Sequence, residues 1–131
     1  EVSRGLAIGD LDNDGDSDAI LCNNSGPARV LLNVHQNNHH WLGLRLLGRQ
    51  GRDAYGALVT VAREGAPPLR RRVQADGSYL SSSDPRVLVG LASQDRVPWV
   101  RVDWPDGDTE TWRGLQIDRY QTLRQGEGER P

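Results

Sequence analysis

The fold of the N-terminal part of this chain is decided by one stretch, Leu6-Ala7-Ile8-Gly9-Asp10-Leu11-Asp12-Asn13-Asp14-Gly15-Asp16-Ser17-Asp18-Ala19-Ile20-Leu21. An aspartate stands at every second position from Asp10 to Asp18, between apolar flanks that are too short and too alternating for helices. Gly15 permits a sharp turn that a residue with a Cβ would resist. The stretch therefore predicts two strands joined by an acidic loop.

The spacing of these aspartates is typical of a calcium-binding loop. Counted from Asp10, carboxylates fall at positions 1, 3, 5 and 9, a glycine falls at position 6, and position 7 can ligate through its backbone carbonyl. An EF-hand would need a glutamate at position 12, where this chain has Leu21. A solvated acidic turn stays open as the alternative. The sequence predicts a calcium site formed by Asp10, Asp12, Asp14, Asp16 and Asp18.

Composition limits the class of protein. The 131 residues carry 16 basic and 18 acidic side chains, which suits one soluble domain or a domain with an appendage and excludes a multidomain machine. The 15 glycines and 7 prolines are spread without a period, which favours many turns between short strands and thus an all-β fold. No apolar run approaches the ~20 residues that span a bilayer. Aromatic and basic residues are not interleaved. We therefore expect no transmembrane segment and no nucleic-acid partner.

Beyond residue 40, alternating apolar residues predict a series of strands. Pro105-Asp106-Gly107 fits a turn, because proline fixes φ and glycine accepts a positive φ. We therefore expect a hairpin over residues 99–112, with Trp104 facing Trp112. The pattern predicts a β-sandwich or a barrel-like antiparallel domain. Its strands are expected at 42–46, 58–61, 69–73, 87–89, 100–104, 109–112 and 120–123.

The first stretch also resembles a known repeat. From Gly5 to Leu21 the sequence is similar to an FG-GAP or VCBS repeat, and the similarity extends over residues 3–34. The resemblance implies a hairpin like one in a β-propeller blade, with calcium in its loop. One repeat cannot close a propeller, so either further blades precede it or the hairpin packs on the domain that follows.

Four later segments carry a second resemblance: Arg52-Asp53-Ala54-Tyr55-Gly56-Ala57, Gly77-Ser78-Tyr79-Leu80-Ser81-Ser82-Ser83-Asp84-Pro85, Val89-Gly90-Leu91 and Val102-Asp103-Trp104-Pro105-Asp106-Gly107. They are similar to the ASPIC/UnbV domain, over residues 40–124. This domain usually follows FG-GAP or VCBS repeats, in cartilage acidic proteins and in secreted bacterial relatives. The resemblance implies an extracellular binding or adhesion role and no catalytic residues. The cysteine-rich C-terminal extension of the animal members is not seen, which favours a bacterial relative.

These interpretations give one domain organisation and one function. We expect a calcium-binding repeat at 1–34, a linker at 35–39, an ASPIC/UnbV-like β domain at 40–124 and a flexible tail at 125–131. The expected function is that of a secreted, periplasmic or cell-surface calcium-binding module for adhesion, protein binding or extracellular assembly. Its partner would be a protein or a glycan, or a second copy held through exposed strand edges. The alternative, implied by the UnbV resemblance, is an accessory protein or enzyme of an enediyne-type secondary-metabolite pathway.

Catalysis is not expected. The stretch Ser81-Ser82-Ser83-Asp84 and the three histidines offer hydrolase residue types, but the chain has no Gly-x-Ser-x-Gly elbow. The serine stretch fits a turn whose short side chains bond nearby backbone. The enzyme alternative therefore depends on the UnbV resemblance alone.

Four further patterns have a functional and a structural interpretation. His35, His39 and His40 could chelate a transition metal, or form a solvated loop. The second group, Asp103, Asp106 and Asp108, could hold another calcium ion, or form a turn. The run Arg70-Arg71-Arg72, with Arg63, fits an anion-binding face, or a charged edge strand, which we favour. Cys22 ends an apolar run and could be a reactive thiol, or a small buried hydrophobic residue, which we favour.

Overall fold

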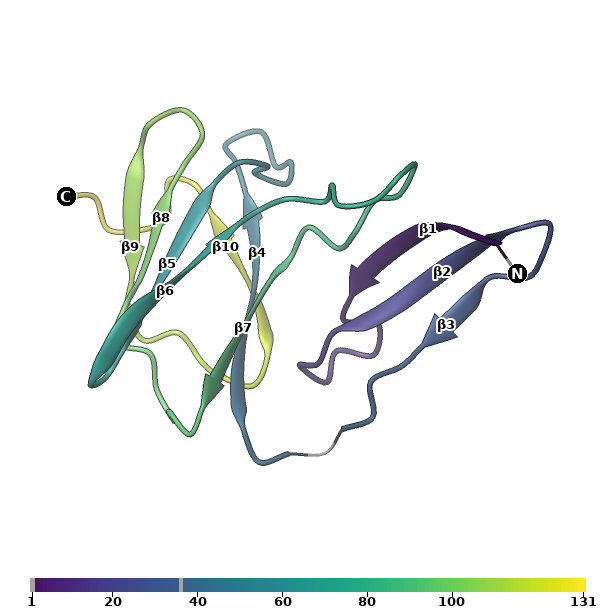
Figure 1. Cartoon of the computed structure of the whole chain (residues 1–131). Coiled ribbons are helices and arrows are strands. Elements are labelled where there is room, and N and C mark those ends of the chain that lie inside the picture. The colour runs from purple at the N-terminus through teal and green to yellow at the C-terminus, as the bar shows by residue number, and fades with distance from the viewer. Residues whose placement is uncertain (1, 36) are drawn as a thin grey trace.

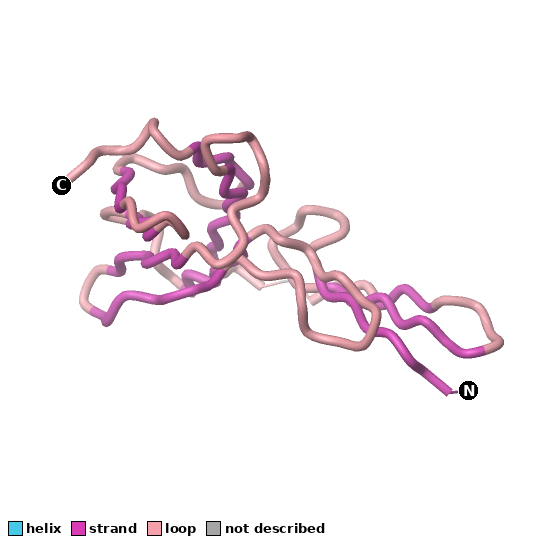
Figure 2. The backbone as a smooth tube through the Cα atoms, turned by 90° about the horizontal axis from the view of Figure 1, so that it is seen from above, coloured by secondary structure: helices cyan, strands magenta, loops and turns pink. Residues whose placement is uncertain are grey.

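The computed structural model describes residues 2–35 and 37–131, and these residues form ten strands and no helix. The all-β prediction is confirmed. The N-terminal sheet contains β1 (Val2–Gly9), β2 (Asp18–Asn24) and β3 (Arg29–Leu31), in the order β1-β2-β3 with antiparallel pairing. The acidic loop joins β1 to β2, as the sequence predicts. In Figures 1 and 2 this sheet projects to one side of the larger body.

The larger body, called the β domain here, contains two sheets that share one core. One sheet has the order β10-β4-β7 and the other β6-β5-β8-β9, and neither closes into a barrel. The core cluster includes Leu44 and Val89 from the first sheet and Val59 and Val102 from the second. The seven strands are β4 (His40–Leu47), β5 (Leu58–Arg63), β6 (Ala66–Arg72), β7 (Val87–Ala92), β8 (Val100–Asp103), β9 (Thr109–Trp112) and β10 (Tyr120–Arg124).

One strand pair departs from the antiparallel expectation. β10 pairs with β4 in parallel, with Tyr120 opposite Gly43. A Cβ built on Gly43 would lie 2.3 Å from the Tyr120 ring, so the glycine makes room for that ring. Alternation of apolar residues predicts strands but not their direction, because both directions alternate with a period of two.

The predicted tryptophan hairpin is confirmed. β8 and β9 pair antiparallel, with Val100 opposite Trp112. The rings of Trp104 and Trp112 lie 6.2 Å apart between centroids in an edge-to-face arrangement. Trp104 also donates a hydrogen bond of 2.7 Å from Nε1 to the buried carboxylate of Glu110. The hairpin therefore buries the Trp104–Glu110 polar pair, with the partly buried Trp112 packed beside it.

The serine stretch lies beside β1. The amide of Asp84 donates to the carbonyl of Ile8 at 2.9 Å, and the amide of Ile8 donates to Ser83 Oγ at 3.1 Å. In Figure 1 the connection between β6 and β7 extends to reach this strand. The short side chains bond backbone, as expected, but the backbone of Ile8 is 75 residues away.

Two sequence expectations concern the surface, the burial of Cys22 and the charged edge strand. Cys22 lies on β2 of the N-terminal sheet and is exposed, so the expectation of a buried thiol is wrong. β6 forms an edge of its sheet, and Arg70, Arg71 and Arg72 are exposed there, which agrees with the charged edge strand. The described residues contain no helix long and apolar enough to cross a membrane.

Candidate metal centre

Three of the five predicted aspartates converge at the junction of β1 and β2. Asp10 follows β1 and Asp18 begins β2, and both are buried, with 3% and 2% of their surfaces exposed. Asp12 is exposed on the loop between them. One carboxylate oxygen from each of Asp10, Asp12 and Asp18 lies within 4.8 Å of the other two. The loop therefore places three negative charges around one point.

Backbone amides hold the two buried carboxylates in place. Asp10 accepts hydrogen bonds from the amides of Asp14 at 3.1 Å and Gly15 at 2.9 Å. Asp18 accepts from the amides of Leu11 at 2.7 Å and Asn33 at 2.8 Å. Such hydrogen bonds offset the cost of burying a carboxylate away from water. The loop curls around its own acidic groups, which explains why they converge.

The electrostatics of the loop disfavour a third ionised carboxylate. The pKa of Asp12 is raised above its ordinary value, first by desolvation and then by the charges of Asp14 and Asp18. A raised pKa means that the ionised form is less stable here than in water. A bound cation would reverse this effect by attracting all three carboxylates.

The donor set fits calcium. Calcium takes hard oxygen ligands at about 2.3–2.6 Å, so two ligands of one ion lie at most about 5 Å apart. The separations among Asp10, Asp12 and Asp18 satisfy this limit. These three residues would hold the ion, and water or backbone carbonyls would fill the rest of its shell.

The side chains of the other two predicted ligands, Asp14 and Asp16, do not join this group. Asp14 accepts a hydrogen bond from the amide of Asp16 at 2.9 Å, and neither residue belongs to the group of three. Both line a neighbouring cavity of about 1110 Å³. Within the described chain the three aspartates are the only group of three or more potential ligands with this geometry. No second group forms among the histidines or among Asp103, Asp106 and Asp108.

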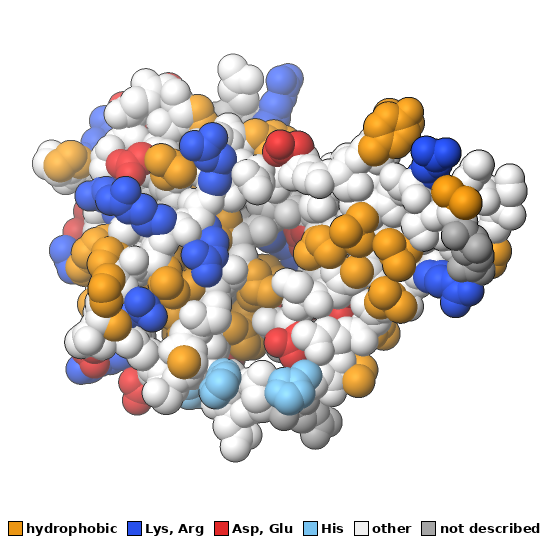
Figure 3. Space-filling model, in the orientation of Figure 1, with side chains coloured by type: hydrophobic (Ala, Val, Ile, Leu, Met, Phe, Trp, Pro, Cys, Tyr) orange, Lys and Arg blue, Asp and Glu red, His pale blue; other side chains and the backbone are white. Residues whose placement is uncertain are grey.

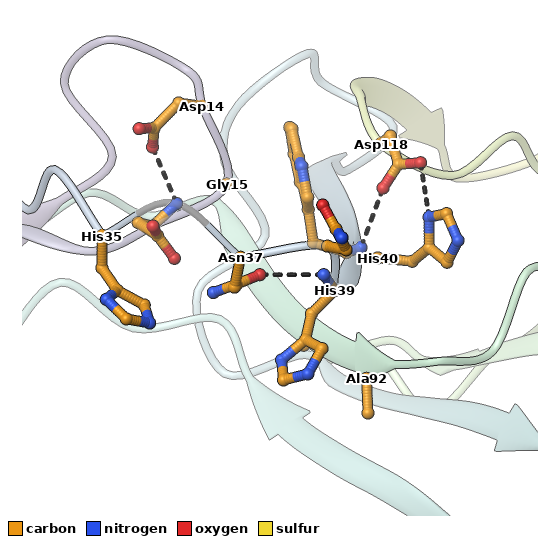
Figure 4. A pocket seen from close by; sticks show the side chains of 12 residues that line it. Asp14, Gly15, His35, Asn37, His39, His40, Ala92 and Asp118 are labelled. Carbon is orange, nitrogen blue, oxygen red and sulfur yellow. Dashed lines mark hydrogen bonds and ion pairs between the residues drawn. The ribbon is translucent and has the colours of Figure 1, made fainter.

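The cavity beside the loop is polar (Figure 4). His40 Nδ1 lies 2.7 Å from Asp118 Oδ2, and the amide of Trp41 donates to the other oxygen of Asp118 at 3.1 Å. His39 donates from its amide to Asn37 Oδ1 at 2.9 Å. The His40 and Asp118 side chains thus pair with each other at the cavity wall.

Contacts from the β domain reach the aspartate loop, and they could not be predicted from local spacing. Tyr120 donates a hydrogen bond of 2.9 Å from its hydroxyl to Asp10 Oδ2, across 110 residues of sequence. Arg86 donates from Nη2 to the backbone carbonyl of Asp10 at 2.8 Å and from Nη1 to Asn13 Oδ1 at 2.7 Å. Partial burial, followed by the bond to Asp10, raises the pKa of Tyr120 above its ordinary value, so Tyr120 stays a neutral donor.

Comparison with known protein families gives a match over most of the β domain. A family model described as ASPIC and UnbV matches residues 48–130. No curated protein matches the chain. The matched range contains Arg86 and Tyr120, whereas the aspartate loop lies before it.

Proposed function

The chain belongs to the ASPIC and UnbV family, and we propose that it is a secreted, calcium-binding β module that acts in binding, adhesion or extracellular assembly. The N-terminal sheet would be the calcium-binding part, corresponding to one FG-GAP or VCBS repeat. The β domain would be the part that positions it.

The observation that carries this proposal is the group formed by Asp10, Asp12 and Asp18, with its oxygens within 4.8 Å of one another. When bound, calcium would supply positive charge and tie the end of β1 to the start of β2. The chain's own residues do the rest: Asp10 and Asp18 are held by four backbone amides, and Asp12 closes the group from the exposed side.

A binding role is supported by the surface of the N-terminal sheet. Leu6 and Ile8 on β1 and Val30 and Leu31 on β3 are all exposed. Hydrophobic side chains gather over this part of the molecule in Figure 3. Apolar groups that stay exposed on a sheet favour contact with a protein partner or a second copy. A glycan partner would instead use the polar cavity beside the loop.

The second candidate is an accessory protein or enzyme of a secondary-metabolite pathway, and the polar cavity favours it. Its wall holds imidazoles and the paired Asp118, which are groups able to move protons. Its described lining holds no serine, cysteine, threonine or lysine that could act as a nucleophile. Binding therefore remains the first proposal.

Calcium dependence of folding tests the proposed function. We expect thermal unfolding to shift upward in millimolar calcium relative to EDTA, because an ion that binds only the folded loop stabilises it. A site saturated ~100-fold over its Kd gains about 2.7 kcal/mol. Differential scanning calorimetry measures the shift.

Two variants of the same loop make the test specific. Asp12→Ala removes a carboxylate of the group and should abolish the shift. Asp16→Ala removes an equal charge from a side chain outside the group of three, at the position expected to ligate through its backbone carbonyl, and should keep the shift. Identical unfolding curves of the wild type in calcium and EDTA would contradict the proposal.

A further inference from the structure

Asp10 takes part in two sets of interactions. Within the loop its carboxylate accepts the amides of Asp14 and Gly15 and belongs to the group with Asp12 and Asp18. From outside the loop the hydroxyl of Tyr120, the first residue of β10, donates to Oδ2 of the same carboxylate. The orientation of one candidate ligand is therefore fixed in part by the β domain.

Arg86 holds the loop at two further points. Its guanidinium donates to the carbonyl of Asp10 and to the side chain of Asn13, a loop residue with a positive φ of 61°. Asp84 fixes the same guanidinium through bonds of 2.8 and 3.1 Å to Nε. Arginine suits this task because its planar fork carries donors in fixed directions. Asp84, through its amide, also bonds β1 at Ile8.

Aromatic packing connects these contacts. The Arg86 guanidinium carbon lies 3.9 Å from the centroid of the Tyr120 ring, and the Trp41 ring lies 5.1 Å from it between centroids. A Cβ on Gly15 would come within 2.3 Å of the Trp41 ring, so the turn of the loop rests directly on that ring. The aspartate loop therefore packs against Trp41, Arg86 and Tyr120 of the β domain.

We propose that Tyr120 and Arg86 are positioning residues of the aspartate loop, so that cation binding at the loop and docking of the N-terminal sheet on the β domain strengthen each other. This inference rests on the proposed calcium site. Residues that hydrogen-bond a metal ligand fix its direction, and removing one usually lowers metal affinity by about 10- to 100-fold. Because linkage is reciprocal, the cation must tighten docking by the factor by which docking tightens the cation.

The test uses Tyr120→Phe, which removes one hydroxyl and keeps the ring that contacts Trp41 and Arg86. Calcium affinity is measured by isothermal titration calorimetry, with Tyr55→Phe as the matched control because Tyr55 is 53% exposed in the connection between β4 and β5. We expect Tyr120→Phe to raise Kd about 10- to 100-fold. Tyr55→Phe should leave Kd unchanged.

Docking is measured separately by amide hydrogen exchange. The amide of Asp84, bonded to Ile8, reports docking, and the amide of Val59, inside the core sheet, reports the β domain. In wild type, exchange at Asp84 should accelerate when EDTA removes calcium, while exchange at Val59 stays the same. Arg86→Lys keeps the charge but cannot span the same acceptors, so it should accelerate exchange at Asp84 even in calcium.

The outcomes separate this inference from the proposed function. If the wild type binds no calcium, the proposed function fails and the inference fails with it. If wild type and Tyr120→Phe bind calcium equally, the calcium site stands and the inference alone is overturned. Exchange at Asp84 that is the same with calcium and with EDTA would also overturn it.

Discussion

The N-terminal sheet and the β domain are stabilised in different ways. In the β domain, side chains such as Leu44 and Val59 are fully buried between two sheets. In the N-terminal sheet, Leu6, Ile8 and Leu31 remain 37%, 41% and 51% exposed, and among the described residues before Leu42 only Asp10 and Asp18 are buried. The β domain is thus stabilised by apolar burial, which accounts for most folding energy. The N-terminal sheet depends on hydrogen bonds and charge.

The largest expected effect contrasts one leucine from each region. Leu44→Ala should destabilise the protein by about 2–5 kcal/mol, because it leaves a cavity in a closed core. Leu31→Ala on β3 should change stability by no more than about 0.5 kcal/mol, because half of the side chain is already in water. Urea denaturation of both variants measures the difference. Similar losses would mean that the N-terminal sheet has its own buried core in solution.

A second contrast concerns the contact between the aspartate loop and the Trp41 ring. Gly15→Ala and Gly107→Ala both place a Cβ at a positive φ, of 93° and 96°. That backbone strain costs roughly 1–2 kcal/mol in each. Only the Cβ at Gly15 meets a neighbour, the Trp41 ring, whereas none lies within 4 Å of Gly107. We expect Gly15→Ala to cost about 1–3 kcal/mol more than its control.

Amide hydrogen exchange at Asp84 and Val59 shows whether the extra destabilisation by Gly15→Ala affects docking of the N-terminal sheet or the core of the β domain. Gly15→Ala should accelerate exchange at Asp84 and leave Val59 protected. Equal free energies of unfolding for the two glycine variants would show that the loop does not rest on Trp41.

The smallest expected effect is that of Asp12→Asn on the unfolding temperature, which should have opposite signs in EDTA and in calcium. Since the pKa of Asp12 is raised in the folded state, its ionised form destabilises the metal-free loop. This cost is absent below the ordinary pKa of an aspartate and grows as pH rises through the raised value. At neutral pH, Asp12→Asn should therefore raise the unfolding temperature slightly in EDTA and lower it in calcium.

The control for this sign change is Asp76→Asn, which removes an equal charge from an exposed position between β6 and β7. It should shift neither curve. Calorimetric scans of both variants in EDTA and in calcium make the comparison. A loss of stability for Asp12→Asn in EDTA would contradict the electrostatic argument.

Short-range patterns could be predicted well from sequence. The aspartate loop, the strands of the β domain and the Trp104–Trp112 hairpin all depend on neighbours within about a dozen residues. Local alternation and turn chemistry determine such features.

Long-range placement could not be predicted in the same way. The parallel pairing of β10 with β4, the position of Ser83 beside β1 and the bond from Tyr120 to Asp10 join residues that are far apart in the chain. Cys22 shows the same limit, because an apolar run predicts a strand but does not reveal whether another layer covers it. The packing of the aspartate loop against Trp41, Arg86 and Tyr120 is therefore determined by the tertiary fold and not by local sequence.

The parallel pair has a consequence for the order of folding. β4 opens the β domain and β10 is its last strand, so the sheet β10-β4-β7 cannot be completed until the chain is present to Arg124. Asp10 emerges 110 residues before Tyr120, a delay of about 5 to 20 s at ribosomal rates. During that delay the loop can form hydrogen bonds to its own amides, but Tyr120 is not yet there for it to pack against. The N-terminal sheet is made before the β domain, and it is therefore expected to reach its final position only after the β domain has folded.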